Sequence, residues 1–406
     1  MLAHLSSLIT DKSTEEVFDY WSTTIEPSIP SVTLYTSQNM LMDTKLVNYC
    51  SSINQLNKAK SSMERLTIHK DINHNNCNLT VGKMLPYITK LPIKITWKIE
   101  PLDIPYFKAT NPSIILNPEN ENELLINVRH VNYYCTEQNQ YICNKSGETI
   151  VHTKNAIYVV NKDLPSFPKK TFLLEDHTDF VKYPSPVQDL EDIRLVARGN
   201  EIWASCTSRE CLADTTPQIM LTQVIWPKKE IIGGLRLLSP DPAAQNVVQK
   251  NWLPFIDHRD NELKFIYSFG PNMLIIQPDE FTGLCKVVHS YPTGLSFQQS
   301  RGGSPPIVFK LKSDPTIEFM CIVHFAYDQP NIRRKYFHRF IFMDKNYKPV
   351  SISEGWFLFE PHSIEFVISA VALNESIYIG TGRNDVDSYV LEIDNSEIEK
   401  LKRWSI

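Results

Sequence analysis

The sequence of 406 residues lacks any long hydrophobic run. No stretch approaches the roughly 20 apolar residues that cross a bilayer as a helix, so no membrane partner is expected. The first ten residues also lack a basic segment, and their short apolar stretch is broken by His4, Ser6 and Ser7. A cleaved signal peptide is therefore not expected, and the sequence predicts a cytoplasmic protein.

Positive charge is not in excess either. Lys and Arg number 41 against 46 Asp and Glu, which gives a net charge of −5. Because binding to phosphate backbones requires concentrated positive charge, nucleic acid is not expected as the main partner. The sequence carries no indication of the oligomeric state.

The eight cysteines include no Cys-x-x-Cys pair, and the histidines form no cluster at metal-ligand spacing. We therefore predict no metal site. Glycine-rich nucleotide-binding motifs and Gly-x-Ser-x-Gly are absent too, so neither a cofactor nor serine-hydrolase chemistry is predicted. Buried free thiols are expected. Disulfides within two hairpins, Cys135–Cys143 and Cys206–Cys211, are the alternative, which a reducing compartment disfavours.

Helical periodicity is confined to the first part of the chain. Residues 15–25 and 44–66 carry apolar side chains at helical spacing, and the Asn-rich segment 71–78 is typical of a loop. The sequence predicts a mainly helical N-terminal extension over residues 1–95. Its apolar stripes should pack against the remainder of the chain, because they cannot remain exposed.

Residues 96–406 consist of short β-rich runs separated by Pro, Asn, Asp and Gly. Many short strands at regular spacing favour an all-β architecture, and the size favours a propeller. Landmark motifs open at Asn111, Glu191, Lys250, Ser304 and Ile364, at intervals of 54 to 80 residues, and predict a five-bladed β-propeller. Since the chain has only 13 Gly, Asn and Asp should supply many of the positive-φ turns.

The same landmarks resemble a known family. In chain order they read Asn111-Pro112, Arg129, Glu191-Asp192-Ile193-Arg194, Lys250-Asn251-Trp252, Arg301-Gly302-Gly303-Ser304-Pro305-Pro306-Ile307, Glu365-Phe366 and the segment 380–385. Over residues 105–395 this order resembles the five-bladed propellers of glycoside hydrolase family 130, the β-1,2-mannosidases and mannoside phosphorylases, and the related mannosyltransferases.

Three segments, 127–133, 335–339 and 364–366, resemble an uncharacterised branch of such propellers that occurs in bacteria and large DNA viruses beside glycosyltransferases. Two departures from the family pattern stand out. Ile193 replaces the family's proline, and no glycine follows Phe366 at the family's spacing.

The resemblance implies a carbohydrate-active enzyme that cleaves or forms a glycosidic bond to a mannoside-like sugar. Asp192 matches the family's general acid, and Glu365 is the candidate second catalytic carboxylate. The substrate is expected to be a glycan, a sugar phosphate or a nucleotide sugar. The expected substrate-binding residues lie at corresponding blade positions, which converge on the axis of a propeller. They are Asn111, Arg129, Tyr133, Arg194, Lys250, Asn251, Arg301, Ser304, His324 and Asp385.

Several alternatives stay open at this point. Hydrolysis requires a base that activates water, phosphorolysis replaces that base with bound phosphate, and transfer uses an activated donor. A glycan-binding propeller without turnover is the alternative function. Glu191 and Arg194 are equally consistent with a structural salt bridge, His324 with a structural strand residue and Trp252 with core packing.

Overall fold

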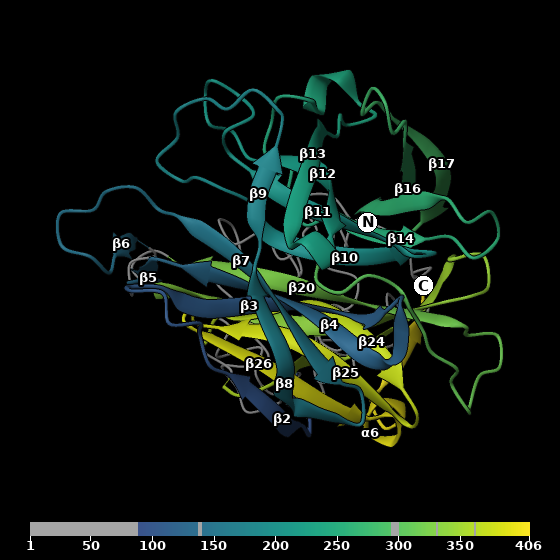
Figure 1. Ribbon diagram of the computed structural model, residues 1–406. Coiled ribbons are helices and arrows are strands. Elements are labelled where there is room, and N and C mark those ends of the chain that lie inside the picture. The colour runs from purple at the N-terminus through teal and green to yellow at the C-terminus, as the bar shows by residue number, and fades with distance from the viewer. Residues whose placement is uncertain (1–87, 137–139, 294–299, 330–331, 361–362) are drawn as a thin grey trace, which may run out of the picture.

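The computed structural model describes residues 88–136, 140–293, 300–329, 332–360 and 363–406 (Figure 1). The predicted helices of the N-terminal extension lie outside these residues. The predicted boundary at residues 95 and 96 falls within a strand, β2 (Lys94–Ile99). Among the described residues, helix is limited to α6 (Asn395–Glu399) and the 3-10 turns η4 (Trp226–Lys228) and η5 (Pro242–Ala244). No helix in the described ranges is both long and apolar enough to cross a membrane.

Five large sheets follow one another along the chain. The first contains β3 (Lys108–Asn117), β4 (Asn120–Val131), β7 (Thr153–Asn161) and β8 (Leu164–Leu173). The second contains β10 (Glu191–Arg198), β11 (Glu201–Ser208), β12 (Gln218–Ile225) and β13 (Glu230–Arg236), with β9 (Glu175–Thr178) parallel to β13. The third contains β14 (Leu253–Ile256), β15 (Leu263–Ser268), β16 (Asn272–Pro278) and β17 (Cys285–Pro292).

The fourth sheet has eight strands and the fifth has four. The fourth contains β18 (Arg301–Gly302), β19 (Ile307–Val308), β20 (Phe319–Gln329), β21 (Ile332–Met343), β22 (Pro349–Ser353), β23 (Gly355–Phe357), β1 (Ile88–Lys90) and β27 (Arg403–Ser405). The fifth contains β24 (Glu365–Leu373), β25 (Ser376–Arg383), β26 (Asp387–Asp394) and β2. A separate hairpin, β5 (Tyr133–Cys135) and β6 (Tyr141–Cys143), extends between β4 and β7.

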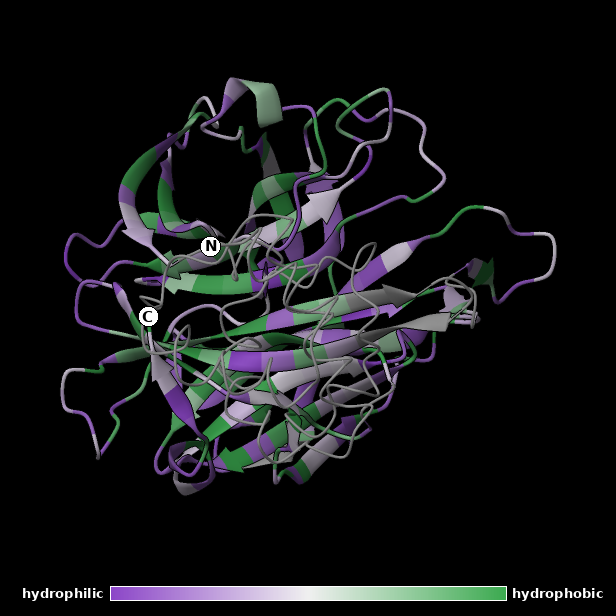
Figure 2. Cartoon of the chain, turned by 180° about the vertical axis from the view of Figure 1, so that it is seen from behind, coloured by the Kyte–Doolittle hydropathy of each residue, from purple (hydrophilic) through white to green (hydrophobic). Residues whose placement is uncertain are grey.

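Hydrophobic clusters join each sheet to the next and close the circle. Four clusters link the first sheet to the second, the second to the third, the third to the fourth and the fourth to the fifth. A further cluster returns from the fifth sheet to the first, where Val371 and Val390 share a core with Leu124 and Ile126. Strand β2 pairs with β26 and so joins the start of the described chain to its end. Apolar and polar stretches alternate along the strands (Figure 2).

The innermost strands surround a common axis. An apolar hollow of about 390 Å³ is lined by one strand from each of the five large sheets, through Ile115, Val196, Phe255, Ile307 and Ala370 among others. Consecutive inner strands are also in contact: β24 with β3, β3 with β10, and β10 with β14. This arrangement is that of a propeller-like all-β fold.

The predicted all-β, propeller-like fold is confirmed, but the prediction of five blades is wrong: the described residues form four regular blades. Four sheets have the regular four-stranded antiparallel blade, one of them extended by β9. The remaining sheet has eight strands, because β1 and β27 add strands from opposite ends of the described chain. In addition, two short strands, β18 and β19, pair with β20, and two others, β22 and β23, pair with β21. The predicted use of Asn and Asp is confirmed: eight of them have positive φ, against five Gly.

Candidate functional site

Three neighbouring inner strands have, near their first residue, a residue in a strained backbone conformation. Asn111 on β3, Asp192 on β10 and Asn251 just before β14 have φ values of 45°, 53° and 62°. The registers of β3 with β4 and of β10 with β11 shift at the first two positions, as in a β-bulge. Bulges and left-handed non-glycine residues are enriched at functional sites, because they redirect a side chain out of the sheet.

These three positions belong to one hydrogen-bonded cluster, which we call the axial cluster: Asn111, Arg129, Asp192, Arg194 and Asn251. Asn111 Nδ2 and Arg129 Nη1, both from the first sheet, each donate to Asp192 Oδ1 at 2.8 Å. Asp192 Oδ2 has no hydrogen-bond partner among the described residues. One oxygen of this carboxylate is therefore fixed and the other is available, on a side chain that is 15% exposed.

Arg129 is held from several sides. Its Nη2 donates to Glu191 Oε2 at 3.2 Å, and its Nε and Nη2 donate to Thr153 Oγ1 at 3.3 Å. Glu191 Oε1 also lies 3.5 Å from Arg209 Nε. Glu191 thus forms structural ion pairs with Arg129 and Arg209, whereas the salt bridge considered between Glu191 and Arg194 does not form among the described residues. Arg129 cannot leave Asp192 without breaking these contacts.

Asp192 is ionised in this setting. Burial alone would raise the pKa of its carboxyl, but Arg129, the Asn111 amide, Lys250 and Arg194 outweigh burial and lower this pKa below its ordinary value. At neutral pH the carboxylate can therefore accept a proton or a hydroxyl hydrogen bond. It carries a proton to donate only after a reaction step has supplied one.

Arg194 lies buried beside Asp192 and has no carboxylate partner among the described side chains. Its guanidinium donates to the carbonyls of Gly303 at 3.3 Å and Gly302 at 3.2 Å, and to Asn251 Oδ1 at 3.2 Å. It also lies 5.7 Å from the ring centroid of Phe366. Burial lowers the pKa of this guanidinium to about 10, although Asp192 raises it, so the side chain stays charged at neutral pH. Arg194 thereby ties together three sheets at the axis.

Two further cations, Lys250 and Arg301, each directly precede in the chain a residue that Arg194 binds, Asn251 and Gly302. Lys250 also contributes to the lowered pKa of Asp192. Neither side chain has a hydrogen bond or an ion pair within the described ranges. The exposed Arg301 and the half-buried Lys250 therefore supply positive charge that is not held in an ion pair with a carboxylate of the described chain.

Glu365, the expected second catalytic carboxylate, is occupied by its own loop. Its two oxygens accept hydrogen bonds from the backbone N–H groups of Leu358, Phe359 and Glu360, at 2.6 to 2.9 Å, and from Ser363 Oγ at 2.7 Å. The side chain is fully buried. With four donors it anchors the segment that leads into β24, and the geometry does not favour a catalytic role.

The other expected residues surround the axial cluster. Tyr133 and Asp385 both contribute to the raised pKa of Arg129. Ser304 is buried, and its Oγ donates to the Pro305 carbonyl. His324 is buried, with its ring 5.0 Å from that of Phe366.

Sequence reasoning missed three contributors: Thr153, Phe366 and Gly382. Thr153 and Phe366 contact the two arginines, as described above. A Cβ at Gly382 would lie 2.0 Å from Asn111 Oδ1, so a glycine is required there. Gly382 on β25 pairs with Phe366 on β24, and this pairing brings the glycine to the site. The register that creates the pairing cannot be deduced from the sequence alone.

Other features of the described chain are structural. Trp252 is buried in the core, as the alternative predicted, and its Nε1 donates to Gln249. Cys143, Cys206 and Cys211 are free thiols, so neither of the two alternative disulfides forms. No group of three or more His, Cys, Asp or Glu able to hold a metal ion occurs among the described residues.

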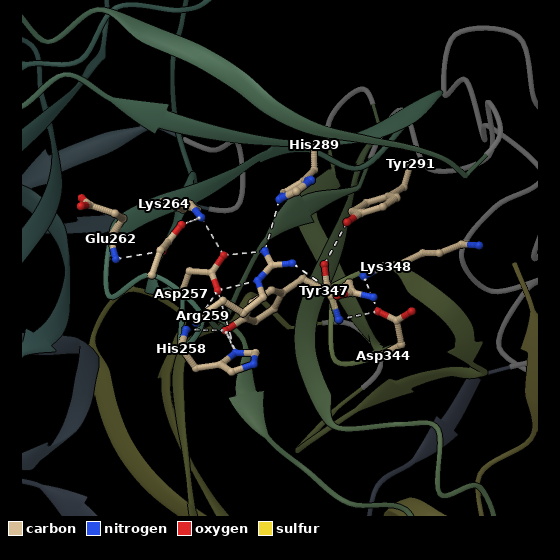
Figure 3. Close-up of polar contacts among 12 residues, drawn as sticks. Asp257, His258, Arg259, Glu262, Lys264, His289, Tyr291, Asp344, Tyr347 and Lys348 are labelled. Atoms are coloured by element: carbon tan, nitrogen blue, oxygen red, sulfur yellow. Dashed lines mark hydrogen bonds and ion pairs between the residues drawn. The ribbon is translucent and has the colours of Figure 1, made fainter.

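Another fully buried carboxylate, Asp257, lies just after β14 of the third sheet (Figure 3). Asp257 Oδ1 accepts from Arg259 Nε at 2.8 Å, and Oδ2 accepts from Arg259 Nη2 at 2.5 Å and from Lys264 Nζ at 2.7 Å. Lys264 also pairs with Asp260. Both oxygens of this fully buried carboxylate are thus used by neighbouring residues of the same sheet.

No family model matches the chain, and no curated protein matches it in sequence. Solved structures do match. A β-1,2-mannobiose phosphorylase from Listeria innocua, solved with β-1,2-mannobiose, has 13% identity over 74% of this chain and 94% of its own, with a TM-score of 0.47. A mannose phosphorylase from Leishmania mexicana, solved with phosphate, has 11% identity over 82% of this chain and 98% of its own, with a TM-score of 0.43. A glycosyl hydrolase from Bacteroides ovatus has 13% identity over 76% of this chain and 94% of its own, with a TM-score of 0.47.

Proposed function

We propose that this protein is a carbohydrate-active enzyme that forms or cleaves a glycosidic bond of a mannoside-like substrate at the axial cluster. The observation that carries this proposal is the state of Asp192. Its Oδ1 is fixed by Asn111 and Arg129, and its Oδ2 has no partner among the described residues. An ionised carboxylate with one available oxygen is suited to accept the proton of a sugar hydroxyl.

The charges around Asp192 favour a phosphorylated sugar as the donor. Lys250 and Arg301 add two cations that form no ion pair with a described carboxylate. Charge-assisted hydrogen bonds from Lys and Arg are the usual means of binding phosphate oxygens. We therefore assign Lys250 and Arg301 to the phosphate group, and the sugar hydroxyls to the amides of Asn111 and Asn251 together with Asp385.

The reaction then follows from the ionised state of Asp192. An acceptor hydroxyl attacks the anomeric carbon of a sugar phosphate and gives its proton to Asp192 Oδ2, while the bond to phosphate breaks and its electron pair leaves with phosphate. In the reverse direction phosphate attacks the glycoside, and the protonated Asp192 returns the proton to the leaving oxygen. The general-acid role that the sequence predicts for Asp192 applies to this reverse reaction, because the two directions share one transition state.

Hydrolysis has less support from the geometry. An inverting hydrolase requires a second carboxylate to activate water. Glu365 is held by four donors, and Glu191 is paired with Arg129 and Arg209. Asp385 is then the remaining candidate for that base, and we assign it instead to the sugar hydroxyls. Transfer from a nucleotide sugar uses the same ionised Asp192 and the same cations, and it remains the alternative donor class within this proposal.

An assay of phosphate release tests this function. The protein is incubated with mannose 1-phosphate and mannose, and then with GDP-mannose and mannose. The expected result is disaccharide together with an equal amount of phosphate, or of GDP. The double variant Lys250→Ala/Arg301→Ala should raise the KM for the donor at least about tenfold, as expected for loss of charged hydrogen bonds.

The matched control is Lys169→Ala, which removes a surface lysine paired with Glu123 at the edge of the first sheet. It should leave the KM unchanged. Binding of β-1,2-mannobiose without turnover of either donor would instead support the alternative, a glycan-binding propeller. Absence of both turnover and sugar binding would contradict both functions.

A further inference from the structure

The apolar hollow at the propeller axis is separate from the axial cluster. The strained residues of the cluster stand near the start of β3, β10 and β14, whereas the hollow is lined by residues further along the same strands. Between these two levels, hydrogen bonds join neighbouring inner strands. Ser113 Oγ accepts from the Leu195 N–H at 2.9 Å, and Ser369 Oγ accepts from the Ile114 N–H at 3.0 Å. The hollow shares no residue with the axial cluster.

The wall of the hollow is almost entirely apolar. Only His258, Tyr347 and Ser369 among its lining residues carry a polar side-chain atom, and the Ser369 hydroxyl is already used within the fold. Leu116 and Val308 also line the hollow and remain 43% and 60% exposed, so it is accessible from solvent. A volume of about 390 Å³ with an apolar wall and few polar groups is typical of a small-molecule site.

His258 provides a hydrogen-bond donor in this wall. Its Nδ1 lies 3.0 Å from Tyr347 Oη, and its backbone N–H donates to the same oxygen at 3.5 Å (Figure 3). Burial raises the pKa of Tyr347 to about 12, so the phenol is neutral and its hydrogen is left to donate to Nδ1. The neutral imidazole then carries its proton on Nε2. This nitrogen has no hydrogen-bond partner in the described part of the chain, and the side chain is 49% exposed.

Aromatic packing holds His258 in place. Its ring lies 5.2 Å from that of Phe319 and 5.6 Å from that of Tyr347, and Tyr347 packs in turn on Phe255 at 4.7 Å. Tyr347 has a φ of 61°, a left-handed conformation that is unfavourable for a bulky residue. Such conformations persist where the surrounding structure enforces them, and they are enriched at ligand sites. The donor therefore has a fixed position beside the apolar wall.

We propose that the hollow binds a small amphiphile, an aliphatic chain with one terminal acceptor oxygen such as a medium-chain carboxylate, with the chain against the apolar wall and the oxygen at His258 Nε2. An apolar cavity of about 150 Å³ holds one benzene molecule, so the hollow has room for roughly a dozen non-hydrogen atoms. A sugar does not suit this wall, because most of its hydroxyls would be buried without partners. The proposal is independent of the function assigned to the axial cluster.

Calorimetry on the full chain with decanoate and decylammonium tests this site. The two probes have the same chain, but only decanoate offers an acceptor, so it should bind at one site per chain and about tenfold more tightly, the effect of one charge-assisted hydrogen bond. His258→Phe keeps a flat ring and removes the donor. It should abolish this preference and leave decylammonium binding unchanged.

Two variants test the location of the chain. Ala197→Phe places a ring in the hollow and should weaken binding of both probes at least about tenfold, the effect of excluding roughly two methylene groups. Val308→Asp changes an exposed lining residue without touching the core, and like-charge repulsion should weaken decanoate binding several-fold. The matched control is Ala243→Phe, in an exposed turn outside the hollow, which should bind both probes as the wild type does.

Three results would overturn the proposal. They are the absence of decanoate binding to the full chain, binding unaffected by both Ala197→Phe and Val308→Asp, and a preference for decanoate that persists in His258→Phe. Melting temperatures matching the wild type would verify that the variants are folded. Phosphate release by Ala197→Phe should equal that of the wild type, because the hollow and the axial cluster are separate, so failure of either proposal leaves the other standing.

Discussion

Asp192 and Asp257 are two carboxylates with lowered pKa values and opposite surroundings. Asp257 is fully buried, and both of its oxygens are bound by Arg259 and Lys264, close neighbours in the same sheet (Figure 3). Asp192 is partly exposed, has a strained backbone and is bound through one oxygen by residues of a different sheet. Both are ionised, so charge state alone does not mark a functional carboxylate.

The two carboxylates differ in whether one or both of their oxygens accept hydrogen bonds from neighbouring residues. A buried ion pair with every oxygen occupied rigidifies its surroundings and has no capacity for a ligand. A carboxylate that is fixed through one oxygen and available through the other is oriented and still able to bind. The left-handed backbone conformation at Asp192 lowers the stability of the fold by about 1 to 3 kcal/mol. A carboxylate with a purely structural role would not require this conformation.

Replacing Asp192 should have the largest effect on activity. Asp192→Asn keeps the size of the side chain and removes the base, so turnover should fall at least about 100-fold. The melting temperature should change little, because the hydrogen bond from Arg129 can persist to the amide oxygen. Initial rates of phosphate release and a thermal melt measure the two effects. Retention of full activity would exclude Asp192 from the mechanism.

Replacing Asp257 should give the opposite pattern. Asp257→Asn leaves the charge of Lys264, whose side chain is 5% exposed, with Asp260 as its remaining partner. The free energy of unfolding should fall by about 2 kcal/mol, whereas turnover per folded molecule should stay unchanged. Denaturant titration measures the loss. Asp260→Asn is the control, because Asp260 is 46% exposed and its pair with Lys264 should contribute less than about 1 kcal/mol.

Gly382→Ala should disturb the axial cluster without removing any of its polar groups. The new Cβ would lie 2.0 Å from Asn111 Oδ1 and 2.6 Å from Thr110 Oγ1, so Asn111 must move away from Asp192. Loss of this hydrogen bond should lower turnover about tenfold. In the control Gly355→Ala, the Cβ meets the Phe337 side chain at 3.1 Å, and activity should be retained. Equal activity of the two variants would show that the position of Asn111 is unimportant.

The smallest effect concerns pH. Burial alone would raise the pKa of Asp257, but Arg259 and Lys264 outweigh it, and the pKa is lowered. Such a group stabilises the fold above its unfolded pKa of about 3.9, and this stability is lost as the pH falls toward the folded value. The melting temperature of the wild type should therefore drop between about pH 5 and pH 3, and that of Asp257→Asn should drop less. Calorimetry measures the melting temperature of both proteins over this pH range. If the melting temperatures of the wild type and of Asp257→Asn fell equally as the pH decreased, this assignment would be contradicted.

The sequence predicts the architecture because the period of short strands and turns is a local property. It also groups Asn111, Arg129, Asp192, Arg194 and Asn251 correctly, since corresponding blade positions meet at the axis. The eight-stranded sheet escapes prediction because β1 and β27 pair with strands far away in the chain. The donors around Glu365 and the contact between His258 and Tyr347 depend on loop geometry and on the packing of neighbouring sheets, which composition does not encode.

The central claim is that Asp192 Oδ2 is the atom that receives a sugar hydroxyl. A crystal structure of the protein with β-1,2-mannobiose tests this most directly. We expect a sugar oxygen about 2.7 Å from Asp192 Oδ2, with Oδ1 still bound by Asn111 and Arg129, and no ligand at Asp257. A disaccharide bound elsewhere on the molecule, or bound at the axis with Oδ2 facing no sugar oxygen, would contradict the account.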